Sequence, residues 1–333
     1  MFLRTNILTM KRIAVLTGGH ASELEISLKS AAVVMKNIDR SLFEPYLIEI
    51  REHQWMCTLE KEELPVDRND FTVALPEGGK LHFDAVFLAI HGTPAEDGKL
   101  QAYLDLLSIP YTACGVLAAA LSFDKMKCKQ FLQSCGIPTA QARLFRPVDW
   151  AAGTAPGIAF PVFVKPNKNG SSFGAGMAKN QNEFDAAMAE AFRYDDEVVV
   201  EEYLQGTEVT CGVLGAGGSL RALPVTEIRS KKAFFDYEAK YKGFSEEITP
   251  AEISAKLTEQ IQQLSVECYR HLGFKGICRV DFIIREEQPF MLEVNAIPGL
   301  SEESIIPQQA RAIGISLPEL FTIMLSDCIA SAV

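Results

Sequence analysis

Three oxygen-bearing side chains stand within two apolar segments near the C-terminal end of the chain. The segments read ICRVDFII and FMLEVN, and the stretch between them is of hairpin length. Because side chains two apart on a strand share a face, Arg279 and Asp281 point one way, and Glu293 and Asn295 also share a face. Two carboxylates and an amide among apolar residues suit a hard divalent cation such as Mg²⁺ with a bound phosphate. The alternative is a solvated strand face with one arginine–carboxylate salt bridge.

A loop rich in glycine and serine follows Lys165 in the sequence KPNKNGSSFGAG. Glycines let backbone N–H groups approach phosphate oxygens, and a lysine adds positive charge. The loop matches neither the Walker A pattern nor GxGxxG, and a loop of this composition is more often only a turn. Lys125 and Lys240 are two further lysines that could serve a polyphosphate.

Two other patterns could receive parts of a ligand. The apolar run VVVEEYL leads into a polar hinge before Gly206 and Glu208. Such a strand can present backbone groups to a purine edge, although an ordinary edge strand is the commoner meaning. The segment PGLSEESIIP is typical of a loop entering a helix, where backbone N–H groups and Ser304 would suit a carboxylate.

Two polar residues close to the first strands are candidates for binding a small substrate. Glu25 is explained as the capping partner of Ser22, whereas Glu23 has no such local role and could bind a cation such as a substrate ammonium. His91 opens the stretch HGTPAEDG after an apolar strand, at the edge where α/β sheets bind ligands. A loop histidine in such a place is more often structural than functional.

The elements that must position these residues begin as an alternation of strands and helices. The sequence predicts strands at 12–17, 43–50 and 84–90, the last of them a continuous apolar run, and a helix that ends near residue 38. This order predicts an open parallel α/β sheet with helices on its faces. Farther along we expect strands at 161–165, 197–203, 208–214, 277–284 and 289–295, and helices at 122–134, 181–193 and 252–272.

This order of elements predicts three domains of α/β and α+β class. The first spans residues 11–113 and the second 114–212. The third spans 213–333 and includes a polar loop at 229–250. Residues 1–10 precede the first strand and are expected to form a short disordered extension.

Composition excludes several classes of protein. The chain has 333 residues, 48% of them apolar and 23% charged, as in globular proteins. Its 43 acidic and 32 basic residues give a net charge of -11, which disfavours non-specific binding to nucleic acid or anionic membranes. The eight cysteines form no CxxC pair, which predicts free thiols in a reducing cytosol. Without a signal-peptide core or an apolar run of ~18 residues, we expect a soluble cytoplasmic protein.

Together these segments resemble the D-alanine–D-alanine ligases of the ATP-grasp superfamily. The resemblance covers the chain from about residue 11 to its end, in six ordered blocks: GGHASELEIS, HGTPAEDGKLQAYLDLLSIPYTACGVLAAALSFDK, FPVFVKPNKNGSSFG, FFDYEAKY, RVDF and EVNAIPGLSEES. It implies an ATP-grasp fold with an N-terminal substrate-binding domain and the nucleotide held between the central and C-terminal domains.

The resemblance also implies a reaction. An ADP-forming carboxylate–amine ligase would join two D-alanines into D-alanyl-D-alanine for peptidoglycan synthesis, through a D-alanyl phosphate and a tetrahedral intermediate. ATP and two Mg²⁺ ions are the implied cofactors, with Mn²⁺ as a substitute. A homodimer is expected, with no nucleic-acid or membrane partner.

The resemblance assigns roles residue by residue. Asp281, Glu293 and Asn295 correspond to the metal ligands. The residues assigned to the nucleotide are Lys125, Lys165 and Lys240 for the phosphates, Glu201, Glu202, Tyr203 and Leu204 for adenine, and Glu208 for ribose. Those assigned to the substrates are Glu23 and His91 for the first D-alanine, Arg279 and Gly299 for the oxyanion, and Ser304 and Ile305 for the second carboxylate. Ser171 and Tyr241 match a hydrogen-bonded link to Glu23 that closes the 229–250 loop and excludes water.

Three rival functions stay open. A depsipeptide ligase would take D-lactate second, and another relative would take D-serine; Tyr241 in the DYEAKY block favours D-alanine. A non-catalytic nucleotide-binding scaffold would not need Arg279 together with the metal ligands and lysines. A dinucleotide-dependent oxidoreductase would carry GxGxxG after the first strand. The chain departs from the family at Thr-Pro-Ala before Glu96, where relatives usually carry glycine, and at Leu24, where relatives often carry a polar residue.

Overall fold

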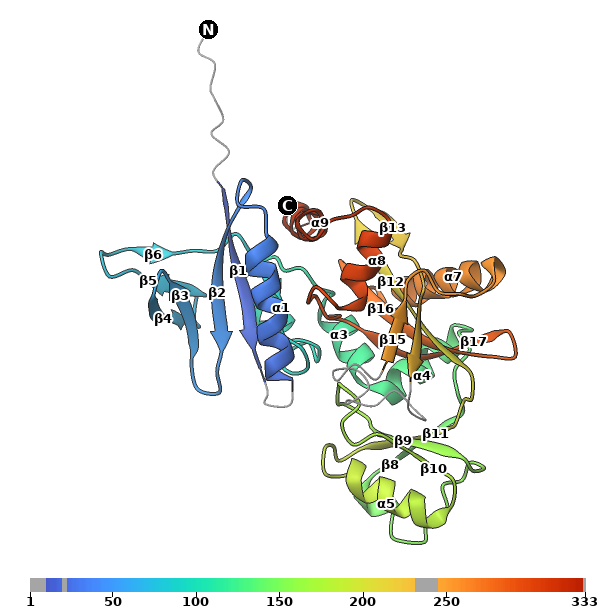
Figure 1. Cartoon of the computed structure of the whole chain (residues 1–333). Coiled ribbons are helices and arrows are strands. Elements are labelled where there is room, and N and C mark those ends of the chain that lie inside the picture. Colours follow the sequence, from blue (N-terminus) through green and yellow to red (C-terminus); the bar gives the residue numbers. More distant parts are fainter. Residues whose placement is uncertain (1–9, 20–22, 231–244, 332–333) are drawn as a thin grey trace.

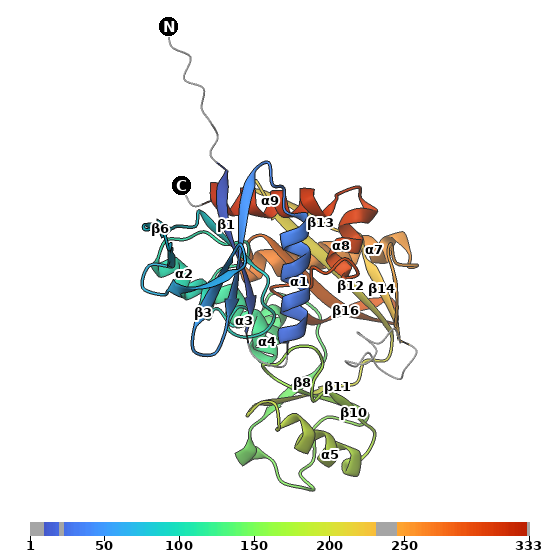
Figure 2. The same cartoon turned by 60° about the vertical axis from the view of Figure 1, so that its left-hand side comes forward.

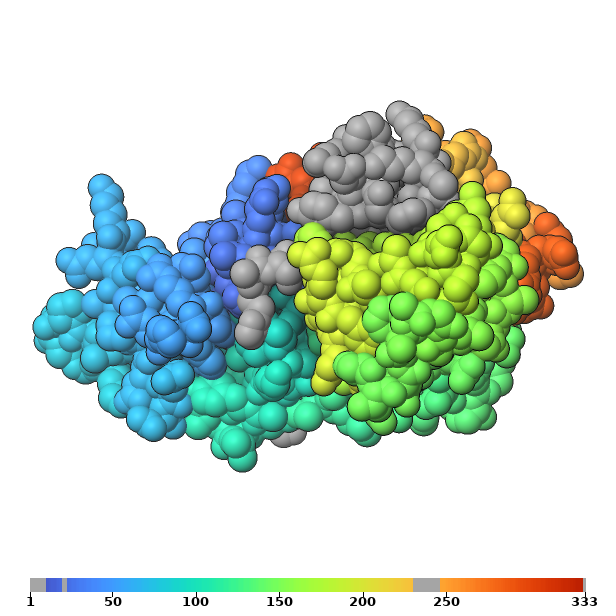
Figure 3. Space-filling model, turned by 90° about the horizontal axis from the view of Figure 1, so that it is seen from below, coloured from blue at the N-terminus to red at the C-terminus, as the bar shows by residue number. Residues whose placement is uncertain are grey.

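The computed structural model describes residues 10–19, 23–230 and 245–331, which fold around three β-sheets. The N-terminal sheet with helix α1 forms one side of the molecule, the C-terminal sheet forms the other, and a small central sheet lies below (Figure 1). Seen from below, the teal segment that leads toward α3 (Val116–Phe123) lies between the N-terminal and central parts (Figure 3).

The N-terminal sheet has the strand order β6-β5-β4-β3-β2-β1-β7. β1 pairs in parallel with β2 and β7, so the predicted parallel core is confirmed. β3 to β6 extend it as antiparallel strands, for which the sequence held no continuous apolar run. The elements are β1 (Lys11–Gly18), α1 (Leu24–Asn37), β2 (Phe43–Ile50), β3 (Trp55–Leu59), β4 (Glu62–Asp67), β5 (Thr72–Ala74), β6 (Lys80–Leu81), β7 (Ala85–Leu88) and α2 (Lys99–Leu106).

The central sheet is antiparallel throughout, in the order β10-β9-β11-β8, and α5 packs on it. Its small core is formed by apolar side chains such as Val162, Phe184 and Val200. The elements are β8 (Ala142–Phe145), a 3₁₀ turn (Pro147–Asp149), β9 (Val162–Pro166), β10 (Gly176–Ala178), α5 (Gln181–Ala191) and β11 (Val198–Glu202).

The C-terminal sheet has the order β15-β14-β12-β16-β17, with β13 paired to β12. The expected domain boundary at 212 falls inside β12, and all the pairing partners of β12 belong to this sheet. α3 and α4 pack against β17, and α3 also contacts α7. The elements are α3 (Val116–Phe123), α4 (Lys125–Ser134), β12 (Thr207–Ala216), β13 (Ser219–Ala222), β14 (Thr226–Ser230), β15 (Ser245–Ile248), α7 (Ala255–Leu272), β16 (Ile277–Arg285) and β17 (Gln288–Asn295).

The last two helices are α8 (Ile305–Ala312) and α9 (Leu317–Ala330), and α9 packs against strands of both the C-terminal and the N-terminal sheet (Figure 2). Phe321 of α9 meets Phe87 of β7 edge to face, with ring centroids 5.4 Å apart. No single described helix is long and apolar enough to cross a membrane. Of the described helices, only α8 and α9 taken together reach that length and apolar composition, and the pair is bent by 102°. This pair belongs to one of the hydrophobic cores.

Candidate active site

A cavity of about 1070 Å³ lies where the three sheets meet. It is lined by every predicted site residue that the structure describes. These are Glu23, His91, Lys125, Lys165, Ser171, Glu201, Glu202, Tyr203, Leu204, Glu208, Arg279, Asp281, Glu293, Asn295, Gly299, Ser304 and Ile305. Lys240 and Tyr241 lie outside the described residues, as does most of the expected 229–250 loop.

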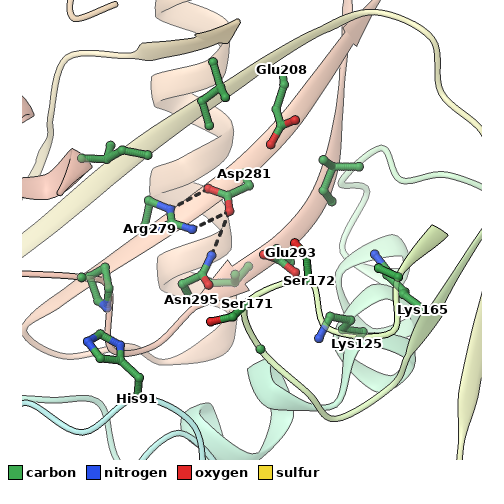
Figure 4. A pocket seen from close by; sticks show the side chains of 18 of the residues that line it. His91, Lys125, Lys165, Ser171, Ser172, Glu208, Arg279, Asp281, Glu293 and Asn295 are labelled. Carbon is green, nitrogen blue, oxygen red and sulfur yellow. Dashed lines mark hydrogen bonds and ion pairs between the residues drawn. The ribbon is translucent and has the colours of Figure 1, made fainter. Parts of the chain in front are cut away.

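The β16–β17 hairpin brings together the four polar residues first identified in the sequence. Arg279 lies opposite Asn295, and Asp281 lies opposite Glu293. Arg279 donates from Nε and Nη2 to the two oxygens of Asp281, each over 2.8 Å, and Asn295 donates to Asp281 Oδ2 over 3.0 Å (Figure 4). The salt bridge expected in the alternative is therefore present, and it lies in the wall of the cavity.

The donor set on this hairpin fits a hard cation. Two carboxylates and one amide oxygen are ligands that Mg²⁺ accepts, usually together with phosphate oxygens. Among the described residues, no group of three or more Asp, Glu, His or Cys side chains is arranged to hold an ion. Asp281, Glu293 and Asn295 would therefore need ligand oxygens to complete the coordination.

A buried polar network beneath the hairpin escaped the sequence analysis. Thr210 of β12 donates its hydroxyl to Asp281 Oδ1. Gln309 of α8 is fully buried; its amide donates to the Thr210 carbonyl and the Thr226 hydroxyl, each over 3.1 Å, and its oxygen accepts from Gly212 N–H at 3.0 Å. This network ties α8 to the strand behind Asp281. A glutamine within an otherwise apolar helix face was the only signal.

Lys125 enters the cavity from the first residue of α4, on the side of the hairpin group away from His91 (Figure 4). Burial lowers the pKa of its amine, and the charge of Glu293 opposes that shift. Its Nζ donates to the Asn169 carbonyl. The helix starts here because Asp124 caps it, accepting from Lys127 N–H over 3.0 Å.

Asn167, which was not predicted, joins the start of α4 to the loop after β9. It is fully buried and accepts from Met126 N–H over 2.9 Å while donating to Asp124 Oδ1 over 2.9 Å. Its amide thereby sets the position of Lys125 relative to the glycine-rich loop.

Lys165 forms an ion pair with Glu201 on the neighbouring strand β11, Nζ to Oε2 at 3.1 Å. A second lysine, Lys129 of α4, lies 3.1 Å from Glu201 Oε1 and was not predicted from the sequence. Burial alone would raise the pKa of Glu201, but Lys129 and Lys165 lower it to about 2. The carboxylate is therefore ionised at neutral pH.

The hinge after β11 is fixed by its own hydrogen bonds. The Glu202 carboxylate accepts from Gln141 N–H over 3.0 Å and from Arg285 over 3.2 Å. The backbone N–H groups of Glu202 and Tyr203 donate to the carbonyls of Gln141 and Pro161. Leu204 follows on the cavity wall, and Glu208 stands in β12 opposite Ile283 of β16.

Glu23 is held by the glycine-rich loop from the central domain. Ser171 donates its hydroxyl to Glu23 Oε1 over 2.7 Å. Ser171 and Ser172 both have left-handed backbone angles, with φ of 53° and 58°, a conformation often found at functional sites. Gly92 and Gly170 border the same carboxylate so closely that a Cβ atom at either position would collide with it.

His91 is buried and held by other protein groups. Its backbone N–H donates to Ser27 Oγ over 3.0 Å, and the Nε2 atom of its ring lies 2.9 Å from Ser30 Oγ. Burial lowers the pKa of the imidazole to about 4, while a hydrogen bond with the backbone of Ile297 opposes the shift. His91 is therefore neutral at pH 7.

Glu96 also lines the cavity and was not predicted as a site residue. Burial and the charge of Glu23 raise the pKa of its carboxyl to about 8. The only sequence signal was its place in the HGTPAEDG stretch. A carboxyl of this kind can donate a hydrogen bond at neutral pH, which an ionised one cannot.

The loop before α8 forms the far wall. Ser304 is the residue before the helix, and its hydroxyl lies 2.7 Å from that of Ser301. A Cβ atom on Gly299 would lie 2.8 Å from Ser304 Oγ, so a side chain there would push this hydroxyl aside. Gly299, Ser304 and Ile305 thus share one edge of the cavity.

The chain matches two family models. Residues 12–114 match the D-ala D-ala ligase N-terminus, and residues 131–326 match the D-ala D-ala ligase C-terminus. A D-alanine–D-alanine ligase of Flavobacterium johnsoniae is 45% identical over 94% of this chain and 98% of its own length. One from Bacteroides fragilis is 42% identical over the same shares of both chains.

Solved structures agree with the sequence matches. The D-alanine–D-alanine ligase from Coxiella burnetii has a TM-score of 0.86 at 28% identity, covering 97% of this chain and 95% of its own. The VanG D-Ala:D-Ser ligase from Enterococcus faecalis has a TM-score of 0.84 at 33% identity, covering 98% of this chain and all of its own. By these matches across nearly its whole length, the chain belongs to the D-alanine–D-alanine ligase family.

Proposed function

We propose that this cavity joins two D-alanines at the expense of ATP. The carboxylate of the first attacks the γ-phosphate and forms D-alanyl phosphate with release of ADP. The amine of the second then displaces phosphate through a tetrahedral intermediate. The observation that carries the proposal is the convergence of Arg279, Asp281, Glu293 and two lysines, from separate domains, on one cavity that also holds Glu23.

The nucleotide half of the cavity neutralises phosphate charge. Phosphoryl transfer depends chiefly on positioning and electrostatic stabilisation, which suits Lys125 and Lys165. Asp281, Glu293 and Asn295 would hold two Mg²⁺ ions, with Mn²⁺ as a substitute, and the ions would supply further neutralisation of the phosphates. Lys240, the third lysine assigned to the phosphates, lies outside the described residues.

The base and sugar of the nucleotide would lie along the hinge. The residues of this wall are Glu201, Glu202, Tyr203 and Leu204, and Glu208 would bind the ribose. The hydrogen bonds that fix the backbone of Glu202 and Tyr203 support a preformed surface for the base.

The substrate half holds the reacting groups. Glu23 binds the ammonium of the first D-alanine, and the Ser171 hydrogen bond fixes the carboxylate for that task. Arg279 and the Gly299 N–H stabilise the oxyanion; losing one such donor typically costs about 10²–10³ in rate. His91, neutral and held by Ser27 and Ser30, borders this pocket.

The second D-alanine would bind at the start of α8. Ser304 and the Ile305 N–H hold its carboxylate, because helix N-termini favour anions. Ser171 and Tyr241 would link to Glu23 when the 229–250 loop closes, which protects the acyl phosphate from water.

We propose D-alanine, in place of D-serine or D-lactate, as the second substrate. The 45% identity to a relative named as a D-alanine–D-alanine ligase supports D-alanine more than the 33% identity to the D-Ala:D-Ser ligase supports D-serine. Tyr241 in the DYEAKY block supports the same choice over D-lactate.

The deciding experiment measures phosphate release from ATP with Mg²⁺ and each candidate substrate. D-Alanine should drive release with formation of D-alanyl-D-alanine. D-Serine, D-lactate and L-alanine should give little product when paired with D-alanine or alone. Turnover with L-alanine but not D-alanine would overturn the assignment.

Two broader properties are proposed with the activity. A cytoplasmic location is supported by eight free cysteines, as in proteins of reducing compartments. A homodimer is supported by exposed apolar side chains on α2 and α3, where Leu106 and Leu117 stand out. Sedimentation velocity should find twice the chain mass of 36.7 kDa, and a monomer at working concentrations would refute the dimer.

A further inference from the structure

Lys129 is a buried cation behind the cavity wall with no role in the proposed reaction. Its side chain is 2% exposed, and its Nζ lies 3.1 Å from Glu201 Oε1. Lys165 approaches the other oxygen of the same carboxylate, also at 3.1 Å. Glu201 and Lys165 are among the described residues that line the cavity, and Lys129 is not. One carboxylate therefore stands between two lysines, of which only one faces the ligand.

Two lysines contact one carboxylate, and this excess of positive charge matters for phosphate binding. A buried carboxylate that loses its only counterion is strongly destabilised. If Lys165 were the only partner of Glu201, drawing its amine toward a phosphate would leave such a carboxylate behind. With Lys129 in place, Glu201 keeps a counterion when Lys165 turns to the nucleotide.

Charge attraction is the main interaction between Lys129 and Glu201. Within the described residues, Lys129 Nζ and Glu201 Oε1 are buried without an aligned hydrogen bond, although they lie within ion-pair distance. Buried polar groups are nearly always hydrogen-bonded. Lys129 and Glu201 attract each other by charge and keep hydrogen-bonding capacity to spare, so their contact can adjust when a ligand binds.

The charges around the pair are few. Lys129 is faced by Glu201 of β11, by Lys165 of β9 and by Cys128 of its own helix. Burial lowers the pKa of Lys129, and the Glu201 carboxylate opposes that shift. Glu201 in turn is faced by the two lysines, which outweigh its burial.

We propose that Lys129 is a positioning residue of the nucleotide site. It is the standing counterion of Glu201, which frees Lys165 to bind the nucleotide phosphates and keeps the Glu201 carboxylate as an acceptor for the amino group of the base. This role rests on the proposed function, because it requires a nucleotide with both a phosphate chain and an amino-bearing base.

The test is a double-mutant cycle on nucleotide binding measured by calorimetry. In Lys129→Met, Lys165 stays paired with Glu201, so the Kd for ADP should rise about tenfold, the loss expected for one charge-assisted hydrogen bond. The Kd for adenosine, which has no phosphates, should change much less. Adding Glu201→Gln removes the charge that holds Lys165 but keeps an amide oxygen that can accept from the amino group of the base, so the double variant should regain most of the ADP affinity.

The matched control is Lys127→Met, which removes an exposed lysine from the same helix and should bind ADP as the unaltered chain does. Lys129 would be merely structural if Lys129→Met lowered the melting temperature but bound ADP normally. If Lys129→Met does not fold, the double variant decides alone, and its failure to bind ADP would overturn the proposal. Failure of the unaltered chain to bind ADP would instead refute the proposed function.

Discussion

Gly170 should be needed for full activity because the Glu23 carboxylate occupies the space where a side chain would begin. A Cβ atom at this position would lie 2.9 Å from the carboxyl carbon of Glu23 and closer still to its nearer oxygen, whereas ordinary contact starts at 3.4 Å. The backbone φ of Gly170 is not in the left-handed region, so Gly170→Ala acts through this collision alone. Glu23 is the end of a flexible side chain, so the carboxylate will move while the fold persists.

The displacement worked from these contacts is about 0.5–1 Å. A misplacement of 1 Å can cost about 10²-fold in rate, so kcat/KM for D-alanine should fall between about 10- and 100-fold. The assay is coupled phosphate release at varied D-alanine, with ADP affinity and melting temperature measured in parallel. Both of the latter should be unchanged, because Gly170 borders Glu23 and not the adenine hinge.

Gly176 provides the control within the same part of the chain. A Cβ atom there would meet nothing within 4 Å, and its φ is also outside the left-handed region, so Gly176→Ala should be active. Adding Gly170→Ala to Glu23→Ala should cost nothing further, since the group that it displaces is gone. The reasoning is refuted if Gly170→Ala is as active as Gly176→Ala, or if it weakens ADP binding as much as D-alanine turnover.

Three other predictions concern His91, Glu293 and Gln309. The pKa of His91 in the folded chain is about 4, below its ordinary 6.5, so the unfolded chain takes up the proton first as the pH falls. The stability that the neutral imidazole contributes is therefore complete above pH 6.5 and is lost as the pH falls to about 4. Urea unfolding at pH 7 and 5 should show a loss of about 2 kcal/mol that His91→Gln lacks. Glu293→Gln should weaken Mg²⁺ binding to the ADP complex, measured by calorimetry, at an unchanged melting temperature. Gln309→Leu should lower the free energy of unfolding by about 2–4 kcal/mol, because it leaves Gly212 N–H and the Thr210 carbonyl unpaired.

Each of these has an outcome that contradicts it. An equal pH-dependent loss in both chains would mean that His91 is protonated in the folded state. Unaltered Mg²⁺ affinity in Glu293→Gln would remove that carboxylate from the metal site. For Gln309, the comparison is Gln308→Leu on the same helix, where the partners are partly exposed and a loss below about 1 kcal/mol is expected; equal losses would show that burial of the network is not the cause.

Much of the fold was predictable because the strands that carry it are largely apolar segments between turns. The strand expected at 43–50 is observed with those bounds, and the strand expected at 277–284 extends by one residue. β3 to β6 were not predicted, since these antiparallel strands are short and partly exposed, with no uninterrupted apolar pattern. The sequence also did not show that β12 belongs to the C-terminal sheet, because strand pairing depends on partners that are distant along the chain.

The sequence by itself determined which residue types could do the chemistry. Spacing on two strands predicted that Arg279 shares a face with Asp281 and Glu293 with Asn295, and the family blocks assigned roles to the lysines and Glu23. Every such residue within the described ranges lines one cavity. These inferences were possible because a strand repeats every two residues and a motif is local in the chain.

Only the tertiary structure decided which residues support those groups. Lys129 and Gln309 lie outside every motif, and the motif around Asn167 and Gly170 gave neither of them a role. Each owes its role to a partner on another element far along the chain. The physical reason is that ion pairing, hydrogen bonding and steric contact act over a few ångströms in space. Local sequence patterns carry no record of which distant segments the folded chain brings within that range.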